Sequence, residues 1–218
     1  MELSKIPSLI VATLFGAAMM GNVANAASSD ETLAHMGHVT SEWTDTPDNM
    51  GLLPTAIAEA KIAAFHAGLA AQQPENLGWM KIHAKHVLHA VDAGMIAKGP
   101  GLGYGVKKAA AGTAKHIGFA AGADGASGNV KAHSVHVSSS AENTVDRVNA
   151  IVALAGQVEA ASNATEAAPL VVDMNAIAQM LLNGHDANGD GKITWMKGEG
   201  GLNAADKHMG FMRKGEGL

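Results

Sequence analysis

Histidine is the residue type in this chain whose number and spacing point to chemistry. The 218 residues include 11 histidines and 12 methionines but no cysteine. Neutral imidazole is the commonest metal ligand in proteins, and without thiolates a transition-metal site here depends mainly on imidazole nitrogen. The lack of cysteine also excludes disulfides and covalently attached c-type haem. The positions of the histidines therefore decide which sites the chain can form.

A fifty-residue internal repeat brings histidines into register. Residues 60–90 align with residues 110–140 without a gap. Three histidine pairs coincide in this alignment: His66 with His116, His83 with His133, and His86 with His136. Alanine-rich helices match one another by chance, so the histidines carry the argument rather than the alanines. The repeat indicates duplication of a helical hairpin.

The elements that position these histidines are expected to be helices. Helical periodicity covers four segments, 54–73, 76–97, 104–123 and 129–161, with glycine- and proline-containing turns between them. Short connections of this kind predict an all-α fold, with a four-helix up-down-up-down bundle over residues 51–162. Whether Ser138 to Ser140 interrupt the fourth helix is left open.

Helical geometry predicts a single layer of six histidines inside that bundle. At 100° per residue the six lie on the faces opposite the lysines, and the two hairpins place them at equal distances from their turns. The predicted metal ligands are His66, His83, His86, His116, His133 and His136. The alternative is a hydrogen-bonded polar layer without metal, but each unpaired buried imidazole costs about 1–3 kcal/mol. His89 has no partner in the repeat and is predicted to lie at the surface.

The predicted function is metal binding for storage, delivery or detoxification. Imidazole suits copper, zinc and iron, and of these we expect copper first. The clusters His35-Met36-Gly37-His38 and His208-Met209-Gly210-Phe211-Met212 combine imidazole with sulfur, which favours copper, although their role is left open, as is that of His185. Two alternatives remain: a dinuclear copper or iron redox enzyme, and a bundle that binds haem non-covalently. No catalytic residue is predicted.

The C-terminal part, residues 163–218, carries a second kind of motif. The stretch from Asp186 to Thr194, Asp-Ala-Asn-Gly-Asp-Gly-Lys-Ile-Thr, resembles the start of an EF-hand calcium loop. The resemblance implies a helix–loop–helix with these calcium ligands: Asp186, Asn188, Asp190, the backbone carbonyl of Lys192, and Thr194. The sequence departs from the pattern at the twelfth position, where Lys197 replaces the bidentate glutamate. Glu199 can take that role only in a lengthened loop.

The N-terminal residues predict export. Lys5, the apolar run from Ser8 to Met20 and Ala24-Asn25-Ala26 fit a signal peptide over residues 1–26, with an uncleaved anchor as the alternative. Residues 27–50 are expected to form a flexible arm. The protein is therefore predicted to be periplasmic or secreted, without stable membrane insertion after cleavage. A net charge of −5 and the lack of a basic stripe argue against nucleic acid, which leaves metal ions as the expected partners.

Overall fold

The computed structural model describes residues 28–218, so the predicted signal peptide over residues 1–26 lies outside the described residues. Within residues 28–218 the chain forms seven α-helices and no β-strand, which confirms the all-α prediction. The helices are α1 (Asp30–Thr40), α2 (Leu52–Ala71), α3 (Leu77–Val91), α4 (Val106–Gly122), α5 (Gly128–Ala160), α6 (Ala164–Asn183) and α7 (Leu202–Glu216). None of the described helices is long and apolar enough to span a bilayer.

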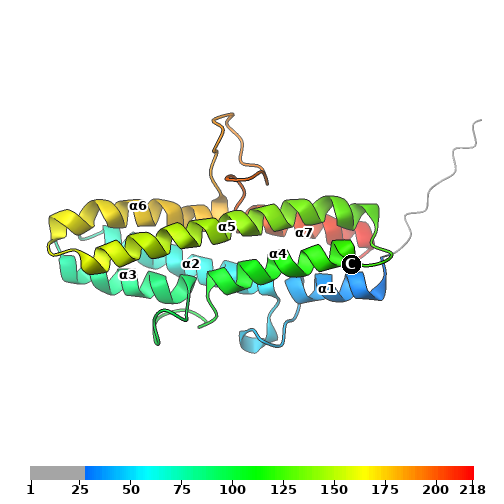
Figure 1. The fold of residues 1–218 in the computed structure, drawn as a ribbon, viewed down its shortest axis with the longest axis horizontal. Coiled ribbons are helices and arrows are strands. Elements are labelled where there is room, and N and C mark those ends of the chain that lie inside the picture. Colours follow the sequence, from blue (N-terminus) through cyan, green and yellow to red (C-terminus); the bar gives the residue numbers. More distant parts are fainter. Residues whose placement is uncertain (1–27) are drawn as a thin grey trace, which may run out of the picture.

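Helix α5 organises the molecule. It has 33 residues and runs along the whole length of the fold (Figure 1). Helices α4 and α7 lie along its N-terminal half, with α1 packed against α4, whereas α3 and α6 lie along its C-terminal half (Figure 1). Ser138, Ser139 and Ser140 fall inside α5 without interrupting it. The long helix therefore joins two groups of helices that carry different histidines.

The structure differs from the predicted division into an arm, a bundle and a C-terminal appendage. The expected arm contains α1, whose N-terminus is capped by the Ser29 side chain and whose Met36 and Val39 are fully buried. Both join the same hydrophobic core as Met174 of α6 and Met209 of α7. The polar composition of residues 27–50 concealed this helix because only one narrow apolar face, spaced three to four residues apart, holds it.

Small residues allow the central helices to approach closely. Helix α2 buries a row of alanines at helical spacing: Ala56, Ala60, Ala63, Ala67 and Ala70. On α4, a Cβ atom added at Gly112 would lie 2.9 Å from a methyl carbon of Leu52, the first residue of α2. Because alanine and glycine leave room for neighbouring backbones, close helix contacts replace the larger side chains of a conventional core.

The connection between α3 and α4 is held by a buried carboxylate. Glu59 of α2 is fully buried and accepts hydrogen bonds from the backbone N–H groups of Leu102, Tyr104 and Gly105, at 3.1, 2.9 and 2.9 Å. It thereby satisfies backbone N–H groups of the connection that leads into α4, the last of them at Gly105, the residue before the helix. His89 packs against the same connection, with Nδ1 3.0 Å from the carbonyl oxygen of Pro100, and is only 6% exposed. The prediction of a surface position for His89 is therefore wrong.

Candidate metal sites

Nine of the eleven histidines gather in three clusters of three. Site A consists of His35, His38 and His116; site B of His66, His83 and His86; and site C of His133, His136 and His208. In each site the potential ligand atoms lie within 4.8 Å of one another. Each cluster can therefore hold a metal ion.

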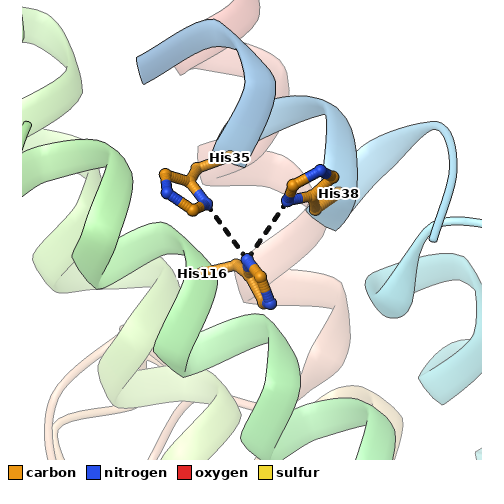
Figure 2. Close-up of side chains that lie close together, drawn as sticks. All are labelled: His35, His38 and His116. Carbon is orange, nitrogen blue, oxygen red and sulfur yellow. Dashed lines mark hydrogen bonds between the residues drawn. The ribbon is translucent and has the colours of Figure 1, made fainter. Parts of the chain in front are cut away.

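Site A joins α1 to α4. His35 and His38 are three residues apart and share one face of α1, as helical geometry requires. Their Nδ1 atoms lie 3.1 and 3.3 Å from Nδ1 of His116 on α4 (Figure 2). The three rings thus converge through the same type of nitrogen.

Sites B and C repeat this arrangement on other helix pairs. In site B, Nδ1 of His66 on α2 lies 3.0 Å from Nδ1 of His83 and 3.3 Å from Nδ1 of His86, both on α3. In site C, Nδ1 of His208 on α7 lies 3.1 and 3.2 Å from the Nδ1 atoms of His133 and His136 on α5. One helix always contributes two histidines and its neighbour contributes one.

A short sequence pattern accompanies each site. The paired histidines occur three times as His-x-x-His-Val, at 35–39, 83–87 and 133–137, and the three valines are fully buried. The single histidines occur as His-x-Gly followed by Leu or Phe, at 66–69, 116–119 and 208–211. The buried valine packs the helix that carries two histidines against the core. Both histidines then lie at the edge of the contact between that helix and the helix that carries the single histidine. The local pattern therefore occurs three times, although the fifty-residue repeat shows only two copies of it.

The spacing of the nitrogen atoms suits a metal ion better than hydrogen bonding. A tetrahedral ion with metal–nitrogen distances of 2.0–2.1 Å places its ligand atoms roughly 3.3 Å apart. A single Nδ1 either donates one proton or offers one lone pair, so the central histidine of a site cannot satisfy both neighbours through that atom. A bound cation removes this conflict because all three lone pairs then point at it.

Each site also has an indole ring beside it. Trp43 lies 4.8 and 4.6 Å from the rings of His38 and His116, Trp79 lies 4.3 Å from His83, and Trp195 stacks on His136 at 4.1 Å. These are the three tryptophans of the chain. Aromatic packing therefore orients at least one imidazole in every site.

Burial favours the neutral form of seven of the nine clustered histidines. Desolvation, followed by the neighbouring imidazoles, lowers the pKa of His66 and of His208 to about 4. Desolvation is also the largest cause that lowers the pKa of His38, His83, His86, His116 and His136. The neutral imidazole is the form that binds metal, so these sites are ready for a cation at neutral pH.

The lowered pKa values predict how the metal-free protein responds to acid. The unfolded chain takes up protons near pH 6.5, whereas folded His66 and His208 resist protonation down to about pH 4. The free energy of unfolding should therefore be greatest above pH 6.5 and fall as the pH drops from 6.5 to 4. Urea unfolding with a chelator present measures this slope. A His66→Gln, His208→Gln variant should show a shallower slope, and an unchanged slope would contradict the assignment.

The predicted single layer of six histidines is not what the structure has. His66, His83 and His86 do meet, but His116 pairs with α1, while His133 and His136 pair with α7. The rings lie at the seams between helices, half-buried or just buried, rather than in the alanine-rich interior. In the hairpin of α2 and α3 the histidines of the two helices meet each other. In the hairpin of α4 and α5 they do not, because the histidine of α4 meets those of α1 and the histidines of α5 meet that of α7. Sites A and C are completed by three histidines whose role the sequence left open: His35, His38 and His208. The His-x-x-His-Val and His-x-Gly-Phe patterns were the sequence signals that could have identified these residues.

The loop between α6 and α7 contains the residues expected to bind calcium. Asp186 accepts hydrogen bonds from the backbone N–H groups of Gly189, Asp190 and Gly191. Asn188 and Asp190 accept further backbone bonds in the same exposed turn. Glu199 is buried and its carboxylate accepts from the backbone N–H of Thr194 at 2.9 Å, so it points back into the loop. Arg147 of α5 donates to the carbonyl groups of residues 198–200 and holds the loop against the helices.

Comparisons of the chain with protein-family models, with curated proteins and with solved structures found no match. The functional assignment therefore depends on the geometry and chemistry of the three sites.

Proposed function

We propose that the protein binds copper or zinc ions, one at each of sites A, B and C, and serves in their storage, delivery or detoxification. One observation carries this proposal: nine histidines from six helices converge in threes, with neighbouring Nδ1 atoms 3.0–3.3 Å apart. A purely structural role for these rings does not explain why the same unfavourable grouping of lone pairs is built three times.

The ligand set favours copper and zinc over the other candidates. Each site offers three neutral imidazoles and no carboxylate, whereas non-haem iron oxygenases combine histidine with carboxylate. Three nitrogens that converge on one point suit a single small ion, whereas haem takes axial ligands from opposite faces of a ring. A dinuclear redox enzyme would need the six predicted histidines around one shared pair of ions. These histidines belong to three different clusters, which argues against that alternative.

Elemental analysis tests the proposal directly. The protein, prepared without a histidine tag, is incubated with an excess of Cu²⁺ or Zn²⁺ and passed over a desalting column. Three retained ions per chain are expected, with quenching of tryptophan fluorescence by Cu²⁺ because an indole lies beside every site. Retention of no metal would overturn the proposal. The export signal expected at residues 1–26 would place this binding in the periplasm or outside the cell.

We further propose that the loop after α6 binds calcium in a structural role. What supports it is the placement of Asp186, Asn188 and Asp190 on one turn, with Glu199 directed inward where the usual glutamate is replaced by Lys197. Hard carboxylate and amide oxygens at alternate positions are the ligands that calcium prefers. Calorimetric titration should show one calcium ion per chain, and Asp186→Asn should weaken its binding about tenfold or more. Equal binding by the variant and the wild type would contradict this site.

A further inference from the structure

Each site leaves part of the coordination sphere of a divalent ion unfilled. Within the described residues, each cluster contains three histidines and no fourth histidine, aspartate or glutamate. Zinc and copper(II) take four or more ligands, and three protein ligands with one open position are typical of sites that bind an exchangeable group. A divalent ion in any of these sites therefore takes a further ligand from solution.

The charge of the site selects an anion for that position. Three neutral imidazoles leave the full charge of the cation uncompensated. In a half-buried site with reduced dielectric screening, a negative ligand is more favourable than water. Charge alone, however, does not distinguish the three sites, because all of them use neutral imidazole.

A lysine directly before the single histidine distinguishes sites A and C from site B, where the lysine before His86, Lys85, lies instead 3.2 Å from a carboxylate oxygen of Glu159. The sequence Lys-His-x-Gly-Phe occurs at 115–119 and again at 207–211, whereas Phe65 precedes His66 in site B. Nζ of Lys115 lies 5.6 Å from the ring centre of Phe119, and Nζ of Lys207 lies 5.8 Å from that of Phe211. These rings lie 5.2 Å from His35 and 5.6 Å from His133, respectively. The same motif thus places an ammonium group over a phenylalanine ring that packs against the histidines of two sites.

The surface beside site A has room for such a ligand. A hollow of about 430 Å³ lies there, lined by Glu31, His35, Gly118, Phe119, Gly122 and Ala123. A Cβ atom added at Gly118 or Gly122 would meet nothing within 4 Å. This volume is many times the roughly 30 Å³ that one water molecule occupies in the liquid. Glu31 also lines this hollow, and its negative charge disfavours a bound anion. Anion binding is therefore better tested at site C.

We propose that sites A and C each bind a divalent ion together with one small inorganic anion, which fills the open coordination position and faces Lys115 or Lys207. Site B then holds its ion with weaker anion binding. This inference rests on the proposed function, since it requires a bound metal ion. It assigns the two lysines to anion recognition and not to metal retention.

Azide binding to single-site variants tests the inference. The double variant His66→Ala, His116→Ala keeps only site C, and His116→Ala, His208→Ala keeps only site B. Each is loaded with one equivalent of Cu²⁺, confirmed by elemental analysis, and titrated with azide while the azide-to-copper charge-transfer absorption is followed. Site C is expected to bind azide about fivefold more tightly than site B at low salt, and Lys207→Met should remove this advantage without loss of copper. Lys214→Met, at the end of the same helix, is the matched control and should have no effect.

The outcomes separate the inference from the proposed function. Copper retention without azide binding, or equal azide affinity with and without Lys207, overturns the inference and leaves metal binding in place. Failure of both single-site proteins to retain either Cu²⁺ or Zn²⁺ overturns the proposed function itself. A loss of the difference between the two sites at high salt supports the lysine charge as its cause.

Discussion

A variant in which His66, His116 and His208 are all replaced by alanine is expected to retain no transition metal, whereas the wild type is expected to retain three ions per chain. Each of these residues is the single histidine that its helix contributes to a site, and it contacts both members of the pair on the neighbouring helix. Without it, two histidines three residues apart on one helix cannot enclose an ion. Each single replacement should therefore lower the metal content by one ion, as measured by elemental analysis.

A second variant distinguishes three separate sites from one shared layer. Replacement of His83 and His133 together damages sites B and C but leaves site A intact. One ion should therefore remain, whereas a six-histidine layer would lose all its metal. His185→Ala is the control, because His185 is exposed and belongs to none of the clusters. Complete loss of metal from the His83, His133 variant would contradict the three-site arrangement.

Metal binding is also expected to stabilise the fold strongly, because each ion joins two helices. Binding to the folded state alone contributes about 4 kcal/mol per site when the free metal exceeds Kd a thousandfold. In a chain of this size each kcal/mol raises Tm by roughly 2–4 °C, so one occupied site should raise it by about 8–16 °C. Thermal unfolding with metal and with a chelator measures the difference. A shift of less than a few degrees in a fully loaded sample would contradict binding at these helix contacts.

The stabilisation by bound metal should be greatest at α1. This helix has only 11 residues, too few for a stable helix in isolation, and site A ties it to α4 through two of its side chains. Hydrogen exchange of the α1 amides should slow when metal is added. The protection should disappear in His35→Ala, His38→Ala, which retains the buried Met36 and Val39, and persist in His66→Ala. Helix α6, which carries no histidine, serves as the internal reference.

Much of the helical architecture could be predicted because its signals are local. The alanine-rich periodic segments and the glycine and proline turns act within a few residues, and α2, α4 and α5 begin and end near the expected positions, whereas α3 ends at Val91, well before the expected residue 97. Helix α1 was missed because a narrow apolar face of Met36 and Val39 gives a weak signal in an otherwise polar segment. The sequence could not show that both ends of the chain belong to the same core, since that depends on contacts between distant residues.

The sequence by itself determined that histidine is the expected ligand type, that histidines occur as i, i+3 pairs and single residues on helices, and that His66, His83 and His86 belong to one hairpin whose turn is only a few residues long. Only the tertiary structure decided the partners of the other histidines. His116 meets His35 and His38, 81 and 78 residues away, and His208 meets His133 and His136, 75 and 72 residues away. The physical reason is that a helix presents its side chains by its own periodicity, whereas which helix lies opposite is chosen by packing over the whole core. Sites A and C therefore depend on where α1 and α7 dock against α4 and α5.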